Sequence, residues 1–437
     1  MYWYNLIITR LLQSYKEVLR KYKKGIQLKI PPDFQIAIQF LEPSPRVVDY
    51  DPTLVRDKLR IALSTLPISI LIIGWDIPLN FVEICREETN KRGIKLFRWQ
   101  PLLTSDGDLP VTKDYQVFCL NGRPVPGFMN MPSFTLMCPN HAPYREQILE
   151  HIADILRPGK YDGIFLDRMR YPALTRDLSA SLACFCPACQ EAAEAVGLEL
   201  SQVKLDINNL ISTYKGRCEL MRSLLLPDTV NHHSGDDNSI TQYLAFRSNT
   251  ITGIVSDVTQ LARSFSAEVG LDCFSPAVSY SVGQDMHSLD KIGDWIKPMT
   301  YLHTFAPAGL PFEINEMNTF LGKVKNQEDT QNLNFLSQTM DFPIPTDQEV
   351  LMEKGLDSIV LTREITKAKR STSNPTLVGI ELVELPGVTW IEKNQLKKDM
   401  EAILDSMADG VVISWDLWNI QEENLHTIAN AIRTHTG

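Results

Sequence analysis

Short apolar segments alternate with helix-patterned stretches along most of the chain, and this alternation limits the folds that are available. Eight segments have the length and composition of buried strands: Phe34–Phe40, Ile68–Asp76, Gly93–Gln100, Asp162–Asp167, Ala267–Phe274, Trp295–Tyr301, Thr376–Leu382 and Gly410–Asp416. Helical spacing of apolar residues predicts helices over Leu54–Leu66, Asn80–Lys91, Tyr144–Leu156, Ile240–Ser264, Glu349–Lys369, Asn394–Met407 and Glu422–Arg433. Eight such units predict an α/β fold of the (β/α)8 TIM barrel type. An open doubly wound sheet is the alternative, but eight units and the lack of a glycine-rich phosphate loop count against it.

The 437 residues suffice for one large barrel with additions. We expect residues 1–30 to form an amphipathic helix packed on the barrel, and residues 31–437 to form the barrel itself. Two connections are long, at about 173–239 after the fourth strand and at 303–375 after the sixth. Connections that follow barrel strands rise over the C-terminal face, so we expect these two to form lids or subdomains there.

The charge and hydrophobicity of the chain argue against some classes of binding partner. The chain has 43 Lys and Arg against 53 Asp and Glu, a formal net charge of −10, which argues against a general affinity for nucleic acid or anionic membranes. The longest apolar run is too short to cross a bilayer. The N-terminus lacks the apolar core and cleavage site of a signal peptide, so we expect a cytoplasmic protein with reduced thiols. The oligomeric state stays open.

Acidic residues fall where predicted strands end. Five strands carry an acid near their C-terminal end: Asp76, Asp167, Asp272, Glu381 and Asp416. Side chains of a strand alternate between two faces, so Gly163, Phe165 and Asp167 share one face. A single acid at a strand end can simply cap the following helix. Five acids at one end of a barrel instead predict a ring of carboxylates at the mouth where barrel enzymes assemble their active sites.

Two opposed carboxylates are the groups that hydrolyse a glycosidic bond. We predict Asp167 as the central catalytic carboxylate and Glu381 as its partner, because strands four and seven lie roughly opposite each other. Asp416 and Asp272 are substitutes for either role. The predicted substrate-binding residues are Asp76, Arg168, Arg170, Asp272, Tyr301 and Trp415, since arginines bind hydroxyls and aromatic rings stack on sugars. A structural ion pair at the rim is the alternative role for the two arginines.

A cluster of cysteines lies in the first long connection. Cys184, Cys186 and Cys189 form a C-x-C-x-x-C run, and Cys138 precedes the fourth strand. Four such thiolates would supply the tetrahedral donor set that structural zinc prefers. Incidental buried thiols and an iron–sulfur cluster are the alternatives. We expect a structural Zn²⁺ and no organic cofactor.

The segment Cys138-Pro-Asn-His-Ala-Pro-Tyr-Arg145, together with Cys184-Phe-Cys-Pro-Ala-Cys189, resembles the zinc-binding pattern of family 42 glycoside hydrolases, which are β-galactosidases. In that family the corresponding cysteines bind one structural zinc beside the barrel, and this resemblance supplies Cys138 as the fourth ligand. The catalytic acid of the family, a Glu that follows an Asn on strand four, is absent here. Asp167-Arg168-Met169 stands in its place, so the galactosidase activity is not implied.

A second resemblance covers about Phe34 to Asn424. The segments Asp162-Gly-Ile-Phe-Leu-Asp-Arg-Met-Arg-Tyr-Pro172 and Trp295-Ile-Lys-Pro-Met-Thr-Tyr301 are similar to a family of uncharacterised glycoside hydrolase-like barrels. Asp167 also occupies the strand-four position at which the α-amylase family holds its nucleophile. These resemblances imply a glycoside hydrolase that acts on an oligosaccharide or glycoside.

Two other functions stay open. A carbohydrate- or ligand-binding barrel that has lost its chemistry is compatible with the missing galactosidase Glu. A metal-dependent hydrolase could use the ring of carboxylates, but no H-x-H ligand pair lies on any predicted strand. A glycosidase-like separation of Asp167 and Glu381 would favour hydrolysis, whereas an occluded Asp167 paired with Arg168 or Arg170 would favour binding alone.

Overall fold

The structure is a computed structural model that describes residues 33–435 except 43–49, 105–108, 110–111, 227–237 and 323–328. The N-terminal helix predicted for residues 1–30 lies outside the described residues. None of the described helices is both long enough and apolar enough to cross a membrane.

Eight parallel strands close into a barrel in chain order, each hydrogen-bonded to its neighbours, and β1 pairs with β8. The strands are β1 (Gln35–Phe40), β2 (Ile70–Ile73), β3 (Lys95–Pro101), β4 (Gly163–Asp167), β5 (Glu268–Phe274), β6 (Trp295–Met299), β7 (Leu377–Glu381) and β8 (Gly410–Ser414). The predicted (β/α)8 fold is confirmed, with every predicted strand present and only its ends shifted.

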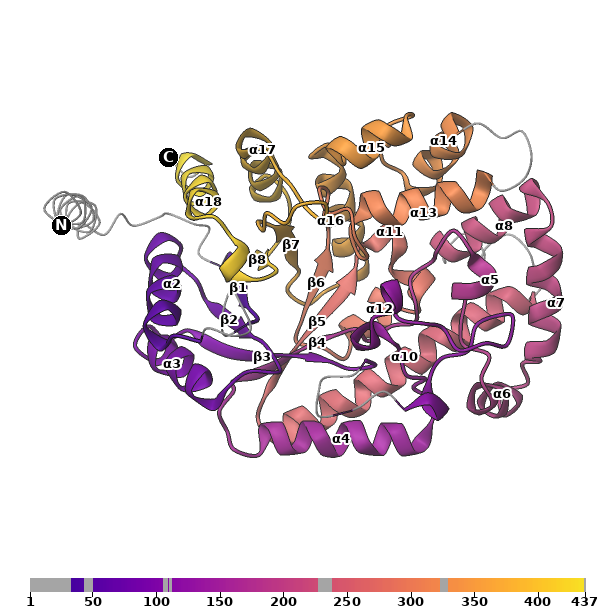
Figure 1. Cartoon of the computed structure of the whole chain (residues 1–437), viewed down its shortest axis with the longest axis horizontal. Helices are drawn as coiled ribbons and strands as arrows, with labels where there is room; N and C mark the ends of the chain where they lie inside the picture. Colours follow the sequence, from indigo (N-terminus) through magenta and orange to yellow (C-terminus); the bar gives the residue numbers. More distant parts are fainter. Residues whose placement is uncertain are drawn as a thin grey trace, which may run out of the picture.

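Helices surround the barrel (Figure 1). They are α2 (Pro52–Thr65), α3 (Leu79–Asn90), α4 (Ala142–Leu156), α10 (Ser239–Ser264), α11 (Pro276–Ser279), α12 (Met286–Asp290), α16 (Ile359–Ser371), α17 (Lys393–Leu404) and α18 (Glu422–His435). Among these, α2 begins where Asp51 accepts a hydrogen bond from the Thr53 amide with Pro52 at the first helical position, the pairing that favours a helix start.

One helix prediction is wrong. The stretch Glu349–Lys369 forms two helices, α15 (Gln348–Lys354) and α16, rather than one. Gly355 separates them with a positive φ of 72°, a conformation that favours glycine, and its α-carbon lies so close to the Leu302 carbonyl that a β-carbon would overlap it. The sequence has helical periodicity on both sides of Gly355, so the pattern alone did not indicate that the helix ends there.

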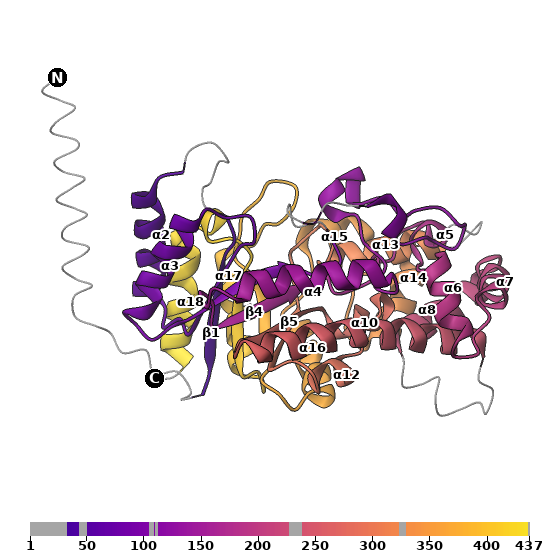
Figure 2. The same cartoon turned by 90° about the horizontal axis from the view of Figure 1, so that it is seen from below.

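Two groups of extra helices extend the barrel on one side (Figures 1 and 2). Between β4 and β5 lie α5 (Leu178–Ser181), α6 (Pro187–Glu194), α7 (Leu200–Ile211) and α8 (Tyr214–Leu225), followed by α10. Between β6 and β7 lie α13 (Leu310–Gly322), α14 (Asp329–Met340), α15 and α16. The two groups are joined by an ion pair between Arg176 and Glu316 and by a hydrogen bond from Arg217 to the Phe320 carbonyl.

Aromatic rings fill the interior of the barrel. Phe165 and Trp295 stack with centroids 5.0 Å apart and planes at 8°, and Phe97 lies 5.7 Å from Trp295. Glycines make room for these rings, because a β-carbon at Gly163 would overlap Phe97 and one at Gly270 would overlap Trp295. Phe165 points inward, so the predicted alternation on β4 is confirmed and Asp167 follows on the same face, one layer nearer the mouth.

We expect Gly270→Ala to lower the free energy of unfolding by about 1–3 kcal/mol, because the added methyl has to displace a packed indole. Gly253→Ala, on α10, is the matched control, because a β-carbon at Gly253 would meet only Arg145 Nη2, at 4.0 Å. The higher helix propensity of alanine should make this change neutral or stabilising by about 0.5–1 kcal/mol. Urea denaturation of both variants checks this, and a Gly270→Ala protein as stable as the Gly253→Ala protein would contradict the packing described.

Candidate functional site

Asp167 ends β4 at the mouth and is partly exposed. Its Oδ2 accepts a hydrogen bond from Trp99 Nε1 at 3.1 Å, and its Oδ1 accepts one from the Arg168 amide at 2.5 Å. Among the described residues, no ion pair includes Asp167. The carboxylate is therefore oriented by two donors while part of it stays open to a ligand.

The two arginines that follow Asp167 contact aromatic rings and oxygen acceptors of other residues. Arg168 has a positive φ of 52°, and its guanidinium lies 4.5 Å from the Phe134 ring centroid and donates to Thr104 Oγ1 at 3.0 Å. Arg170 lies 4.6 Å from the Phe274 ring centroid and donates to the Tyr171 carbonyl at 3.1 Å. Burial lowers the pKa of both groups. The fully paired, occluded Asp167 expected of a binding-only barrel is not what the structure has.

A buried ion pair lies deeper in the mouth. Lys297 Nζ is 3.0 Å from Asp272 Oδ2, and it donates to Gln39 Oε1 at 3.3 Å. Lys297 is only 1% exposed and Asp272 2%. Lys297 Nζ also lies over the rings of Phe165 and Tyr301, at 5.5 and 5.3 Å. The pair therefore separates the apolar interior from the polar mouth.

The second oxygen of Asp272, Oδ1, is buried and has no hydrogen-bond partner within the described part of the chain. Burial raises the pKa of Asp272 to about 7, the charge of Lys297 opposes that rise, and the charge of Asp167 adds to it. Burial lowers the pKa of Lys297, but the charges of Asp272 and Tyr301 and the hydrogen bonds to both together outweigh this effect and raise it. The pKa of Asp272 therefore lies near neutrality and depends on the charge of Asp167.

Sequence reasoning missed Lys297, although a signal existed. It lies on β6 two residues after Trp295, so the alternation of the strand places it on the inward face. A lysine on the inward face of a buried strand needs an acidic partner. Gly379 on β7 makes room for it, because a β-carbon there would stand 2.7 Å from Lys297 Cε.

The other two predicted catalytic acids are held by different groups. Glu381 is 2% exposed and accepts from the His303 amide at 2.5 Å, and His303 Nε2 lies 3.1 Å from Asp399 Oδ2. Asp416 accepts from the Leu41 amide at 3.1 Å. Burial raises the pKa of both Glu381 and Asp416 to about 7, with the charge of His303 opposing the rise at Glu381.

The remaining predicted binding residues divide into two groups. Tyr301 and Trp415 come together, with ring centroids 6.0 Å apart, and burial raises the pKa of Tyr301 to about 12. Asp76 is exposed, because β2 ends at Ile73 and the strand alternation stops before it. Trp75 packs against the interior cluster instead, 6.4 Å from Trp99.

Glu313 on α13 is a further acid that the sequence did not reveal. It is 3% exposed, accepts from the Ala308 amide at 2.9 Å, and burial raises its pKa to about 7 against the charge of Arg170. The charges of Asp167, Glu313 and Asp272 all act on Arg170. Glu313 belongs to the second insertion, so no strand pattern could have placed it there.

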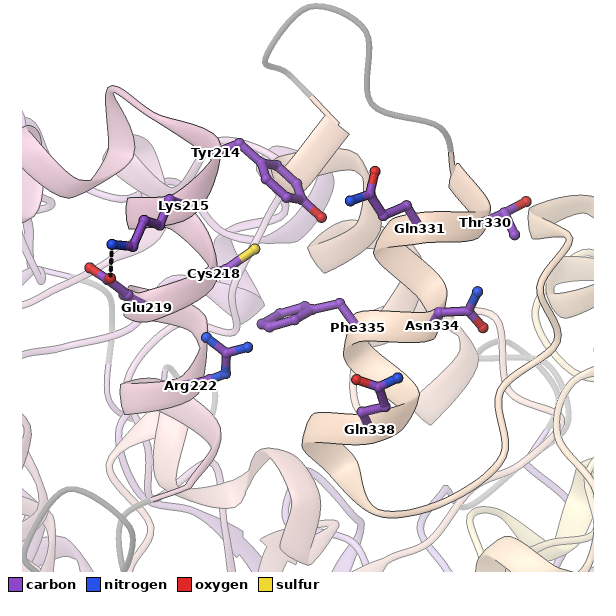
Figure 3. Close-up of a pocket in the computed structure, with 10 residues that line it drawn as sticks. All are labelled: Tyr214, Lys215, Cys218, Glu219, Arg222, Thr330, Gln331, Asn334, Phe335 and Gln338. Carbon is purple, nitrogen blue, oxygen red and sulfur yellow. Dashed lines mark ion pairs between the residues drawn. The ribbon is translucent and has the colours of Figure 1, made fainter. Parts of the chain in front are cut away.

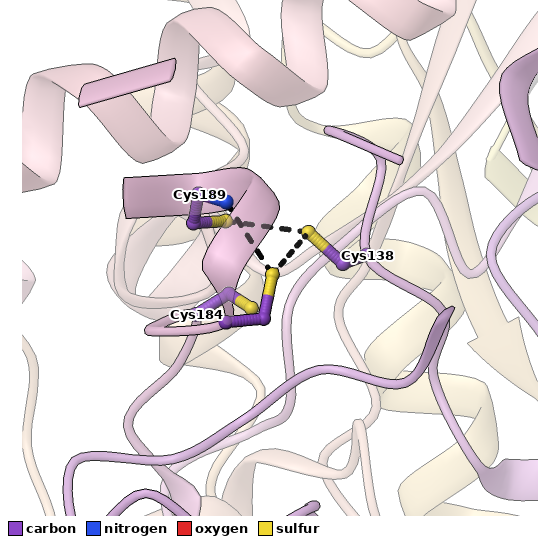
Figure 4. Close-up of side chains that lie close together, drawn as sticks. Cys138, Cys184 and Cys189 are labelled. Carbon is purple, nitrogen blue, oxygen red and sulfur yellow. Dashed lines mark hydrogen bonds between the residues drawn. The ribbon is translucent and has the colours of Figure 1, made fainter. Parts of the chain in front are cut away.

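The four cysteines of the predicted metal site meet in one buried cluster (Figure 4). All four sulfurs lie within 4.8 Å of one another, with Cys138 3.3 Å from Cys189 and 3.6 Å from Cys186. Cys186 caps the N-terminus of α6, and its sulfur accepts a hydrogen bond from the Cys189 amide at 3.4 Å. Burial raises the pKa of the Cys138 thiol, whereas hydrogen bonds from the other three thiols lower that of Cys186.

This donor set fits a metal ion. A tetrahedral site with Zn–S bonds of about 2.3 Å places its sulfurs roughly 3.8 Å apart, close to the separations seen here. The donors are all soft sulfur, they are all buried, and the cysteines form no disulfide. The cluster can therefore hold a metal that ties the segment before α4 to the first insertion.

A surface hollow of about 620 Å³ lies elsewhere, between α8 and α14 (Figure 3). In it Arg222 lies 4.8 Å from the Phe335 ring centroid, and Lys215 pairs with Glu219 at 3.8 Å. Glu219 is the one acid in its lining, which shares no residue with the barrel mouth. A pair of carboxylates is thus found at the mouth and not in this hollow.

Similarity to known proteins is structural. No protein-family model matches the sequence, and no curated protein matches it. The PgaB (BpsB) glycoside hydrolase domain from Bordetella bronchiseptica aligns over 93% of this chain and 99% of its own length, with a TM-score of 0.53 and 13% identity. The catalytic domain of β-amylase from Paenibacillus polymyxa aligns over 94% of this chain and 100% of its own, with a TM-score of 0.51 and 9% identity. At such identities the likeness shows the barrel fold alone.

We expect the purified protein to contain about one metal ion per chain, because four converging thiolates complete a tetrahedral shell. Cys186→Ser should lose most of that metal and lower the melting temperature, since metal binding adds folding free energy to the insertion. Cys218→Ser removes a buried cysteine outside the cluster and is the control. Elemental analysis with thermal denaturation checks this, and equal metal contents in the two variants would remove the site.

Proposed function

We propose that the protein hydrolyses a glycosidic bond at the C-terminal mouth of its barrel. The observation that carries this proposal is Asp167, a partly exposed carboxylate that accepts hydrogen bonds from Trp99 Nε1 and a backbone amide and forms no ion pair among the described residues. Two barrels with TM-scores above 0.5, described as a glycoside hydrolase domain and a β-amylase domain, add support at the level of the fold.

Asp272 is the partner of Asp167 that we favour. Glycoside hydrolysis needs one carboxyl group that can protonate the leaving oxygen and one carboxylate that attacks the anomeric carbon or activates water. A pKa of about 7 leaves Asp272 partly protonated at neutral pH. The protonated form can donate to the leaving oxygen, and the carboxylate that remains is paired with Lys297, which suits the acid. Asp167 is then the attacking or water-activating carboxylate. The positive charges of Lys297 and Arg170 both lower the pKa of Asp272.

This choice differs from the partner that the sequence favoured. The neighbouring groups that act on the pKa of Glu381 are His303 and Asp399. Those that act on the pKa of Asp416 are Glu42 and nearby backbone amides. Asp272, in contrast, lies on the strand adjacent to Asp167 and its pKa responds to that residue. Glu381 and Asp416 are the second choices.

The substrate that we propose is an oligosaccharide or a glycoside. Aromatic rings with a polar edge bind the flat faces of sugars, and Trp75, Trp99, Tyr301 and Trp415 line the mouth region in two contacting pairs. Trp75 and Trp415 are partly exposed, so their rings are available to a ligand.

The metal that we propose for the cysteine cluster is zinc, in a structural role. Four thiolates fill a tetrahedral shell and leave no position for water or substrate. The cysteines lie on the segment before α4 and at the start of α6. Zinc bound there would hold the first insertion against the barrel and take no part in hydrolysis.

A carbohydrate-binding barrel without turnover is the second candidate. It is favoured by the burial of Asp272, Glu381 and Asp416, which are 2%, 2% and 4% exposed. A protein that binds oligosaccharides at the mouth but releases no product would fit that function instead.

Asp167→Asn should remove most hydrolytic activity, on the order of 10³-fold or more, because an amide can neither attack nor exchange a proton. A screen of chromogenic glycosides and oligosaccharides identifies the substrate, and rates on it are then compared with those of Asp57→Asn, a change of an exposed acid on α2. Full activity in the Asp167→Asn protein would rule out the assignment.

Lys297→Met should move the alkaline limb of the activity profile to higher pH. The charge of Lys297 lowers the pKa of Asp272, so its removal raises that pKa above about 7 and keeps the acid protonated further into the alkaline range. Lys369→Met, which breaks the ion pair to Asp409, is the control and should leave the limb in place. An unmoved limb in a folded Lys297→Met protein would exclude Asp272 as the acid.

A further inference from the structure

A buried arginine on α10 has unsatisfied polar atoms. Arg247 on α10 is 1% exposed, and its Nη1 donates to the Ser281 carbonyl at 3.0 Å. Its Nε and Nη2 are buried without a hydrogen-bond partner, and no ion pair between described residues includes it. A guanidinium stays charged in proteins, so burying one without an anion is strongly unfavourable.

Two tyrosines contact this arginine, and one of them connects it to the cysteine segment. The Arg247 guanidinium carbon is 4.8 Å from the Tyr171 ring centroid and 5.7 Å from that of Tyr243. Tyr243 stacks on Phe185 with centroids 5.0 Å apart, and Phe185 lies between Cys184 and Cys186 in the chain. Both tyrosine hydroxyls are buried without partners. Burial raises the pKa of these hydroxyls, the cysteines add to the rise, and Arg247 opposes it, so all three groups share one environment.

Charge balance decides what this environment needs. Four neutral thiols or two disulfides carry no charge and would leave Arg247 uncompensated. A divalent ion bound by four thiolates carries a net charge of minus two and would provide the missing anion. Contacts with the faces of two aromatic rings attract a cation, but more weakly than an anionic partner does at a buried position.

We infer that Arg247 is the counter-cation of the cysteine site and strengthens the binding of a divalent metal there, because the complex of that metal with four thiolates is anionic. This inference rests on the proposed zinc site. Arg247 contacts the two tyrosines and touches no substrate, so it is a positioning and charge-balancing residue.

The test is the zinc affinity of the full-length protein, measured by competition with a chromogenic chelator. Arg247→Gln keeps an amide donor for the Ser281 carbonyl but removes the charge, and should weaken zinc binding by about 10- to 100-fold, as outer-sphere changes do. Arg247→Lys keeps the charge and should recover most of the affinity. Arg217→Met, which removes an arginine bonded to the Ile211 and Phe320 carbonyls, is the control for loss of packing and should bind zinc as the wild type does.

Cobalt substitution supplies a second readout. The Co²⁺ forms of the wild type and of Arg247→Gln should have the same tetrahedral thiolate spectrum, because the charge of Arg247 affects affinity and not the identity of the ligands. A folded Arg247→Gln protein with wild-type zinc affinity would overturn the inference while leaving the metal site intact. If that variant does not fold, a folded Arg247→Lys protein that has lost zinc would overturn it equally. A wild-type protein that binds no zinc would remove the metal site and this inference together.

Discussion

The buried ion pair of Lys297 and Asp272 is the interaction on which the arrangement of the mouth depends. Taking two charges out of water is costly, and the cost is offset only where good geometry and further polar contacts are present. Here the two groups meet at 3.0 Å, Gln39 binds the ammonium, and Gly379 leaves space for the lysine chain. Stacked aromatic rings fill the barrel one layer below this pair, and Asp167 lies beside Asp272 on the neighbouring strand.

The second constraint is the attachment of the two insertions. The cysteine cluster connects the segment before α4 to α6, and Arg176 pairs with Glu316 between the first insertion and the second. The second insertion in turn carries Glu313, whose charge acts on Arg170 at the mouth. The two insertions are thus attached to the barrel and to each other by contacts between distant parts of the chain.

Much of this could be predicted from the sequence, for physical reasons. A buried strand of a closed barrel is a short apolar run with fixed alternation, so the eight strands and the inward face of Asp167 followed directly. The alternation failed at Asp76, where the strand ends three residues earlier, and the helix pattern failed at Gly355, where local conformation overrides periodicity. The position of Lys297 on the inward face of β6 is a sequence signal for a buried ion pair, and the prediction from sequence did not include it. Glu313 and Arg247 carried no such signal, because their neighbours are set by packing between distant segments.

The central claim is that Asp167 and Asp272 act on a sugar bound at the mouth. The most direct measurement is a crystal structure of the Asp167→Asn protein with an oligosaccharide that the wild type hydrolyses. The geometry described here predicts a glycosidic oxygen within about 3 Å of Asp272, with the anomeric carbon beside position 167. A sugar bound away from the barrel mouth, or a glycosidic oxygen out of reach of Asp272 and next to Glu381 or Asp416, would contradict it.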